Sequence, residues 1–311
     1  MNFNDIAHPS DILIDLIPDI KERWGRGKDI SLSFLPTLDK KLWGIKRKNL
    51  VVIAGRPTMG KSDLLLNIAY SAATQKKKVL FFSLEMSKEK CVERLISDRC
   101  EVENTLLETG QVIYKKEFDD KIQEFYEELK TLDLIFLESH GKTIPEILNI
   151  IENFGKQDLI IIDYVNMIKT PLNQRRGAID EYIKDLRVMA KDMNFCAVIG
   201  AQISRETHKN KDSIPKCPNM WELKESGALE EIADLILIVH WEHKYKYEVE
   251  GIEDDKEKYI IKVAKNKEGR TGEFECRIQP QFCRISEVEE KPYPDIPRNN
   301  AELNISRKDF E

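Results

Sequence analysis

The stretch Gly55-Arg56-Pro57-Thr58-Met59-Gly60-Lys61-Ser62 decides how this chain folds. It matches G-x-x-x-x-G-K-[ST], the Walker A pattern of a phosphate-binding loop. The apolar run 50–54 precedes it and predicts a buried parallel strand, and apolar residues recur at helical spacing over 64–69 behind it. A chance match in a glycine-containing turn is the alternative reading of the pattern alone. Because a strand and a helix flank the loop in the required order, we expect the chain to bind a nucleoside triphosphate.

The residue types in this loop suit phosphate chemistry. Gly55 and Gly60 allow a tight turn in which backbone N–H groups face phosphate oxygens, and the helix that begins there adds its positive dipole end. Lys61 would bring its charge to the β- and γ-phosphates, and the Ser62 hydroxyl is placed to bind Mg²⁺. The residues predicted to contact the nucleotide are Gly55, Arg56, Pro57, Thr58, Met59, Gly60, Lys61, Ser62 and Asp63.

The composition narrows the class of protein. The 311 residues suffice for one large domain or two small ones, and 41% hydrophobic with 33% charged residues is typical of a globular chain. No apolar run approaches the ~20 residues of a membrane span, and the six cysteines form no C-x-x-C pair. We therefore expect a cytoplasmic protein without membrane contact, zinc site or disulfides. The net charge of −6 means that any nucleic-acid binding must come from local basic loops.

Strand-like and helical patterns alternate along most of the chain. The strands are expected at 50–54, 78–83, 134–137, 159–163, 196–202 and 235–239, and helical patterns include 87–98, 104–131, 145–154 and 179–193. This alternation predicts an α/β fold with a mostly parallel sheet and helices on both faces. Residues 258–286 change to a β-hairpin pattern around Glu268-Gly269.

These patterns predict that the chain is organised in three parts. They are an N-terminal segment 1–30, an α/β domain 31–286 and a polar C-terminal tail 287–311. The first part contains an amphipathic helix at 10–24, which either packs on its own domain or docks on a neighbouring subunit.

Three polar residues are expected at the carboxyl ends of strands. Asp163 follows four aliphatic residues, as in a Walker B motif, and would give Mg²⁺ its second anchor beside Ser62. Glu85 could orient the attacking water, or it could simply precede the next helix as a capping-region residue. Gln202 could sense the γ-phosphate, or it could be a neutral residue at a strand end.

Two basic stretches follow strands of the same sheet, 174–177 and 204–211. They could be solvated surfaces. Because both leave the edge at which nucleotide is expected, we favour contacts with a nucleic-acid backbone through Arg175, Arg176 and Arg205.

These motifs together resemble the ATPase domain of the DnaB-family replicative helicases, which has a RecA-like P-loop NTPase fold. The resemblance runs from about Leu32 to Ile285. Its stretches are Gly55–Ser62, Phe82-Ser83-Leu84-Glu85-Met86-Ser87, Ile162-Asp163-Tyr164, Gln202-Ile203-Ser204-Arg205, Leu223-Lys224-Glu225-Ser226-Gly227-Ala228-Leu229-Glu230 and Ala264-Lys265-Asn266-Lys267-Glu268-Gly269. The last three are specific to this family. The resemblance implies an ATP- and Mg²⁺-dependent DNA helicase that translocates on single-stranded DNA as a homo-oligomeric ring, a hexamer.

The resemblance also implies roles for individual residues. Glu85 is expected to be the catalytic glutamate and Gln202 the sensor of nucleotide state. Lys224, Glu225 and Gly227 would meet single-stranded DNA in a central pore. The helix at 10–24 looks like the family's linker helix, which packs on the adjacent subunit.

Two departures from the family are visible. The family's N-terminal collar domain, which receives primase, has no counterpart here, so we expect either a natural short form or a truncation. Where the family has the arginine finger that contacts a neighbour's ATP, this chain has Lys267. Lys265 and Arg270 are expected to assist it, although all three could be solvated hairpin residues.

Other functions are compatible with the same residues. A DNA-stimulated ATPase that does not unwind, such as a recombinase or a loader, is one alternative. A nucleotide-gated oligomeric scaffold is another. Helicase loaders and primase are the further partners that the resemblance suggests.

Overall fold

The computed structural model describes residues 9, 16–18, 20, 27–111, 116–169, 175–203, 216–223, 227–244 and 255–288. Contacts between residues divide the chain into a unit of Ile30–Val288 and a second unit made of 1–29 and 289–311. All the helices and strands discussed below belong to the first unit. The helix predicted at 10–24 lies largely outside the described residues, and the predicted domain limits stay a prediction.

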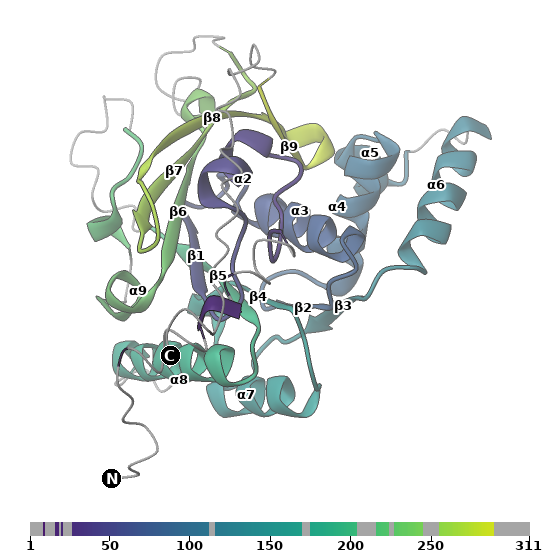
Figure 1. The fold of residues 1–311 in the computed structure, drawn as a ribbon. Helices are drawn as coiled ribbons and strands as arrows, with labels where there is room; N and C mark the ends of the chain where they lie inside the picture. Colours follow the sequence, from purple (N-terminus) through teal and green to yellow (C-terminus); the bar gives the residue numbers. More distant parts are fainter. Residues whose placement is uncertain are drawn as a thin grey trace. The chain divides into compact units, whose positions relative to one another are not determined.

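A nine-stranded sheet forms the centre of the described unit (Figure 1). Its strands lie in the order β3 (Leu134–Glu138), β2 (Val79–Ser83), β4 (Leu159–Asp163), β5 (Cys196–Gln202), β1 (Leu50–Gly55), β6 (Leu235–His240), β7 (Lys258–Asn266), β8 (Gly272–Gln279) and β9 (Arg284–Glu287). The first six are mutually parallel, whereas β7, β8 and β9 pair in antiparallel fashion. The predicted mostly parallel sheet and its C-terminal hairpin are therefore confirmed.

Helices cover both faces of this sheet, as the α/β pattern predicts (Figure 1). The hydrophobic cluster on one face includes residues of α2 (Pro36–Leu42), α3 (Lys61–Thr74), α4 (Lys88–Cys100) and α6 (Lys116–Leu129). The cluster on the other face includes residues of α7 (Ile144–Asn153), α8 (Arg175–Asp192) and α9 (Gly227–Ile232). Along β1, Val51 and Ile53 belong to the first cluster and Val52 to the second. This alternation follows from the two-residue period of a strand.

Two helix ends show how local sequence sets the elements. Ser87 caps α4, its side chain accepting a hydrogen bond from the Lys90 N–H at 3.2 Å, as the sequence predicts. The helical stretch expected at 104–131 is instead divided into α5 (Asn104–Thr109) and α6. Gly110 ends α5 in the left-handed region, with φ of 66°, which glycine adopts without steric cost.

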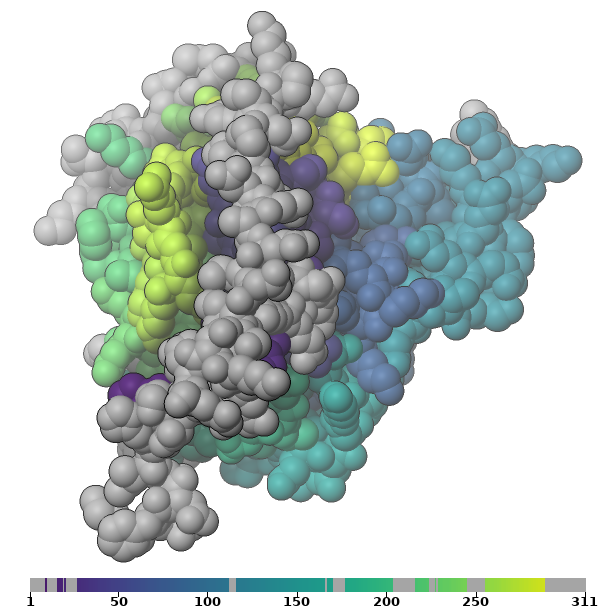
Figure 2. Space-filling view, in the orientation of Figure 1, coloured from purple at the N-terminus to yellow at the C-terminus, as the bar shows by residue number. Residues whose placement is uncertain are grey.

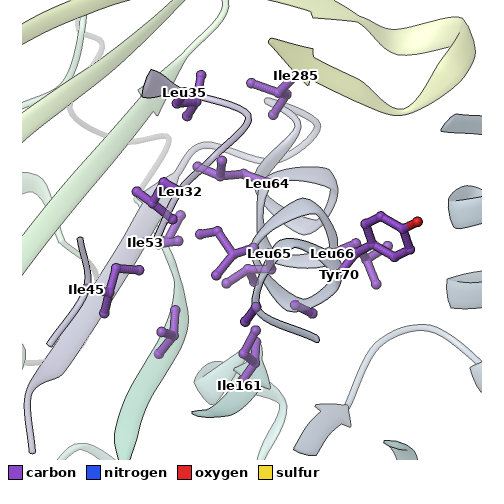
Figure 3. Packing of buried hydrophobic residues seen from close by; sticks show 14 of the residues in the cluster. Leu32, Leu35, Ile45, Ile53, Leu64, Leu65, Leu66, Tyr70, Ile161 and Ile285 are labelled. Carbon is purple, nitrogen blue, oxygen red and sulfur yellow. The ribbon is translucent and has the colours of Figure 1, made fainter. Parts of the chain in front are cut away.

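Helix α3, which begins at the Walker A lysine, is packed tightly against the sheet (Figure 3). Leu64, Leu65 and Leu66 are each at most 1% exposed and lie in one cluster with Ile53 of β1 and Ile161 of β4. Each such buried side chain stabilises the fold by about 1.5–3 kcal/mol. The core therefore holds α3 in place, and with it the last residues of the phosphate loop, where α3 begins.

The C-terminal strands are joined to the helical side of the unit. Arg284 of β9 forms an ion pair with Asp98 of α4, with Nε and Oδ1 2.6 Å apart, and the Asp98 side chain is 1% exposed. In Figure 2 the yellow residues near β9 accordingly lie against the blue residues of α4 and α5. The hairpin region is thus an integral part of this unit.

Among the described residues, no helix combines the length and apolar character needed to cross a bilayer.

Candidate nucleotide-binding site

The phosphate loop follows the central strand β1 and is held by the C-terminal hairpin. Gly60 has φ of 73°, and a Cβ atom there would lie 2.7 Å from Cδ1 of Ile278 in β8. The positive φ and the close end of the Ile278 side chain together favour glycine at this position. The Tyr259 hydroxyl of β7 donates a hydrogen bond of 2.7 Å to the Met59 carbonyl. Burial raises the pKa of Tyr259 well above its ordinary value, so the hydroxyl keeps its proton and remains a donor.

Strand ends bring the predicted catalytic residues to one edge of the sheet. In the register, Gly55 of β1 lies opposite Gln202 of β5, and Ser83 of β2 lies opposite Asp163 of β4. The Leu84 N–H donates to the Asp163 carbonyl at 2.8 Å, which places Glu85 beside the end of β4. This is the carboxyl edge of a parallel sheet, where open α/β folds bind their ligands.

A cleft of about 360 Å³, within the size range of small-molecule sites, lies at this edge of the sheet. Its lining contains the predicted residues Gly55, Arg56, Pro57, Thr58, Gly60, Lys61, Ser62, Asp63, Glu85 and Gln202, together with Met86, Arg94 and Tyr164. Met59 supports the loop through its carbonyl and is 2% exposed. The Glu85 side chain is exposed to the cleft, whereas Gln202 is half-buried.

Lys61 lines this cleft and forms an ion pair with Asp163, a buried residue that is not among the lining residues. Lys61 Nζ lies 3.8 Å from Asp163 Oδ1 and 4.0 Å from the ring centroid of Tyr164. Burial lowers the pKa of Lys61, while the carboxylates of Asp163 and Glu85 oppose that shift.

Asp163 has the surroundings of a cation ligand. Its side chain is 1% exposed, and both carboxylate oxygens are buried without a hydrogen-bond partner in the part of the chain that the structure describes. A Cβ atom at Gly200 of β5 would lie 2.9 Å from Oδ1, so glycine leaves the room that the carboxylate occupies. Buried carboxylate oxygens that accept no hydrogen bond are costly unless a cation satisfies them, and the Lys61 ammonium group is 3.8 Å away.

The structure adds residues that sequence reasoning missed. Arg94 of α4 lines the cleft and donates to Asp63 Oδ1 at 2.7 Å. Burial raises the pKa of Asp63, and the Arg94 charge opposes this shift. Tyr164 covers Lys61, and the His140 ring shares a 2.7 Å hydrogen bond with the Leu84 carbonyl at the turn that leads to Glu85. None of these contacts has a sequence motif that would have revealed it. The one available signal is that Arg94 lies on the helix that directly follows Glu85, seven residues after its cap Ser87.

Arg56 lines the cleft, as predicted for a nucleotide contact, and its side chain also contacts a second segment. Its side chain belongs to the phosphate loop but turns toward segment 216–223, where NH2 lies 3.2 Å from Glu222 Oε2. Its NH1 donates to the Lys216 carbonyl at 3.4 Å. The guanidinium is therefore engaged by protein oxygens beside the cleft.

The predicted DNA-binding residues are only partly described. Arg205, Lys224 and Glu225 lie outside the described residues. Gly227 is the first residue of α9, and Arg175 and Arg176 are the first two residues of α8, which begins four residues earlier than expected.

The residues predicted to contact a neighbour's nucleotide lie at the other end of the sheet. Asn266 at the end of β7 pairs with Leu235 at the start of β6, whereas the phosphate loop follows the carboxyl end of β1. Lys265 Nζ donates to the carbonyls of Glu230 and Glu231, at 2.6 and 2.8 Å. Lys267 Nζ donates to the Ile232 carbonyl at 2.9 Å and lies 3.4 Å from Asp234 Oδ1. Arg270 is exposed in the hairpin turn, so the three cations face away from their own phosphate loop.

A cleft on the carboxyl edge of a parallel sheet whose last strands turn antiparallel is the architecture of the RecA-like P-loop NTPases. Solved structures show the same fold. A DnaB-like replicative helicase, solved in a study of its interactions with primase, has a TM-score of 0.76 over 91% of this chain and 68% of its own, at 22% identity. A second solved structure, of an ATPase domain, has a TM-score of 0.79 over 91% of this chain and 100% of its own, also at 22% identity. The model of the DnaB-like helicase C-terminal domain family matches residues 32–287, and the chain belongs to this family.

Curated relatives agree with this assignment. The replicative DNA helicase DnaB of Haemophilus influenzae is 30% identical over 267 residues, which cover 83% of this chain and 55% of the relative. The DnaB helicase of Rickettsia prowazekii is 26% identical over 293 residues, covering 83% of this chain and 58% of the relative. The chain thus spans little more than half the length of these relatives.

Proposed function

We propose that the chain is the ATP-hydrolysing motor of a DnaB-type replicative DNA helicase and translocates on single-stranded DNA as a hexameric ring. The observation that supports this most is the ion pair, at 3.8 Å, between Asp163 and Lys61, which lines the Walker A cleft, in a chain of this family. The lysine suits the phosphates of ATP, and the carboxylate suits the metal that accompanies them.

Ser62 and Asp163 are the residues that would hold Mg²⁺. A hydroxyl and a carboxylate are hard oxygen ligands, and the Asp163 oxygens, which accept no hydrogen bond from the described residues, fit such an ion. When bound, Mg²⁺ neutralises the charge that develops on the phosphate oxygens. Lys61 would neutralise further charge, and its burial strengthens that interaction.

The remaining cleft residues divide the other tasks. Glu85, exposed to the cleft beside the end of β4, would orient the attacking water and accept its proton. Gln202, opposite Gly55, would sense the γ-phosphate and relay its loss to the loop that follows β5. Contacts to the DNA backbone would come from Arg175, Arg176, Arg205, Lys224, Glu225 and Gly227.

In a ring, a neighbouring subunit would supply the cations that contact a nucleotide from outside its own subunit. Lys265, Lys267 and Arg270 lie at the end of the sheet opposite their own phosphate loop, so a nucleotide contact by them would be to a neighbouring subunit. Lys267 would act there in place of an arginine finger. Primase and a helicase loader are proposed as further partners, the first because a structural neighbour was solved in a study of its primase interactions.

Unwinding of a forked duplex tests this function. We expect the protein to separate a fork with single-stranded tails only with ATP and Mg²⁺, and Lys61→Ala to abolish unwinding and hydrolysis while the fold persists. An ATPase rate of Lys61→Ala within about threefold of wild type would contradict the site assignment, since that is a barrier change of under ~1 kcal/mol. DNA-stimulated hydrolysis without unwinding would indicate a recombinase- or loader-like ATPase. Nucleotide binding without any DNA stimulation would indicate a scaffold.

A further inference from the structure

The turn between β2 and α4, which carries Glu85, is fixed at the residue just before Glu85. The Leu84 N–H donates to the Asp163 carbonyl at 2.8 Å, and the Leu84 carbonyl lies 2.7 Å from Nδ1 of His140. A carbonyl oxygen can only accept a hydrogen bond, so Nδ1 of His140 must carry the proton. The Leu84 carbonyl belongs to the peptide group that joins Leu84 to Glu85. The imidazole ring therefore holds the backbone at Glu85 itself.

The residue after Glu85 is fixed as well. The Ser83 hydroxyl, at the end of β2, donates to the Met86 carbonyl at 2.5 Å and accepts a hydrogen bond from the Cys91 thiol, whose sulfur is 3.7 Å away. Burial raises the pKa of Cys91 to about 11, so this thiol keeps its proton near pH 7. Glu85 is thus placed by its two neighbours in the chain, while its own side chain is exposed to the cleft.

The loop between β3 and α7 holds His140 in position. The Ser139 N–H donates at 2.9 Å to the carbonyl at the end of β2, which continues the pairing of β2 with β3 by one residue. Thr143 forms a parallel bridge with Lys169, in the segment that follows β4. The other ring nitrogen of His140, Nε2, lies 3.6 Å from Glu138 Oε1. The ring therefore projects from a loop that is tied to β2 and to the segment after β4.

We propose that His140 is a positioning residue for ATP hydrolysis, which sets the orientation of Glu85 by holding the Leu84 carbonyl. This inference rests on the proposed role of Glu85 in orienting the attacking water. His140 is absent from the described residues that line the cleft, so it acts on the reaction through the backbone of the turn. A catalytic base must lie within hydrogen-bond reach of the water, and a misplacement of 1 Å can cost about 10²-fold in rate. Loss of the His140 contact should therefore slow hydrolysis and spare nucleotide binding.

The experiment measures single-turnover hydrolysis of ATP with Mg²⁺ by the full chain, and it measures affinity with a non-hydrolysable ATP analogue. His140→Phe keeps a planar ring without the donor, so the rate should fall at least about fivefold while the Kd of the analogue stays within about twofold of wild type. His140→Ala also lacks the donor and should show the same split. His140→Asn places an amide N–H near the position of Nδ1 and should restore the rate to within about twofold of wild type. The His140 side chain is 43% exposed, so these substitutions should leave the fold intact.

Two comparisons separate this role from a general structural one. Glu138→Gln changes the group that faces Nε2 but leaves the donor at Nδ1, so it should hydrolyse ATP within about twofold of the wild-type rate. In a chain that already carries Glu85→Gln, His140→Phe should cause no further fall in rate. Two residues that act as a unit have effects that do not add, and His140 would have no carboxylate left to position.

Each result has a distinct meaning. If His140→Phe hydrolyses ATP at the wild-type rate, if His140→Asn is as slow as His140→Phe, or if the effects of His140→Phe and Glu85→Gln multiply, the inference is wrong and the proposed function stands. If His140→Phe loses nucleotide affinity in step with its rate, His140 supports the cleft as a whole, and the inference is again wrong. If Glu85→Gln itself hydrolyses ATP at the wild-type rate, the proposed role of Glu85 fails and the inference fails with it.

Discussion

Tyr259 and Met59 are 200 residues apart in sequence and 2.7 Å apart in space, hydroxyl to carbonyl. The first lies on an antiparallel strand that follows the parallel sheet, and the second lies inside the Walker A loop. The hydrogen bond joins two parts of the fold with separate sequence patterns. Its consequence is that the shape of the phosphate loop depends on β7 as well as on β1.

Tyr259→Phe is expected to loosen the phosphate loop. The change leaves the buried Met59 carbonyl without its donor, which costs about 1–3 kcal/mol of unfolding free energy. Denaturant unfolding should show this loss, and the KM for ATP should rise several-fold because the loop's N–H groups are less well placed. Tyr126→Phe, at a residue 54% exposed, is the matched control and should change neither quantity. Equal stability and equal KM in the two variants would mean that the hydrogen bond has no such role.

Gly200→Ala is expected to weaken the metal site. The added Cβ would lie 2.9 Å from Asp163 Oδ1 and 3.1 Å from Leu65 Cδ1, so the carboxylate must shift. The Mg²⁺ concentration that gives half-maximal ATPase activity should rise at least about fivefold, equivalent to roughly 1 kcal/mol. Gly177→Ala is the control, since a Cβ there meets nothing within 4 Å. An unchanged Mg²⁺ requirement in Gly200→Ala would argue against Asp163 as the metal anchor.

Glu85→Gln is expected to separate binding from hydrolysis. The amide keeps the shape but cannot accept a proton, so kcat should fall by about 10²–10⁴ while the Kd of ATP changes less than about threefold. Single-turnover hydrolysis and nucleotide titration measure the two quantities. Glu89→Gln, which removes an exposed carboxylate on α4, should leave both unchanged. A collapse of nucleotide binding in Glu85→Gln would make Glu85 a structural residue.

Lys267 is expected to act across a subunit boundary. Arginine fingers contribute about 10³–10⁵ in rate, and a lysine, which lacks the planar fork, should contribute less than that. We expect Lys61→Ala and Lys267→Ala each to be nearly inactive when pure. Rings assembled from both should regain ATPase activity, because an intact loop in one subunit can face an intact Lys267 in the next. No rescue on mixing would mean that Lys267 acts within its own subunit or not at all, and the ring mechanism would lose its main support.

Binding to single-stranded DNA is expected to depend on phosphate contacts. Affinity should fall steeply with salt, with little sequence preference, and each lost contact should reduce the slope of log K against log salt by about 0.7. Arg205→Ala combined with Lys224→Ala should therefore lower the slope by about 1.4 without reducing basal ATPase activity. The double variant Lys130→Ala with Lys258→Ala removes the same charge from surface ion pairs just after α6 and on β7, and it should bind as wild type does. Unchanged affinity in the first variant would move the DNA site elsewhere.

Much of the architecture could be predicted from the sequence. The apolar runs that end in Gly55, Ser83, Asp163 and Gln202 have strong local signals, and parallel strands bring their carboxyl ends to one edge. The helical stretch at 104–131 was wrong in one respect. The prediction gave more weight to the polar, helix-favouring residues on both sides of Gly110 than to Gly110 itself. In the structure, Gly110 ends the first helix in the left-handed region.

Several contacts in the site could not be predicted. The Arg94–Asp63 pair, the Tyr259–Met59 hydrogen bond and the Arg56–Glu222 pair join residues between 31 and 200 positions apart. Such contacts depend on how elements pack, and packing leaves no periodic signal in the sequence. The Walker A pattern predicts Arg56 at the nucleotide, but it gives no sign that the Arg56 side chain also contacts Glu222.

Strand β7 has a further consequence for any ring. Tyr259 lies near its beginning and Lys267 directly follows its end, a separation of eight residues or about 27 Å. β6 pairs with β7 from Ile260 to Asn266, and β8 pairs with it from Lys258 to Val263, so hydrogen bonds hold this stretch on at least one side. In a ring of the kind proposed, one strand would then carry both Tyr259, which supports a subunit's own phosphate loop, and Lys267, which that subunit would present to its neighbour. The spacing between successive nucleotides would depend on the length of β7.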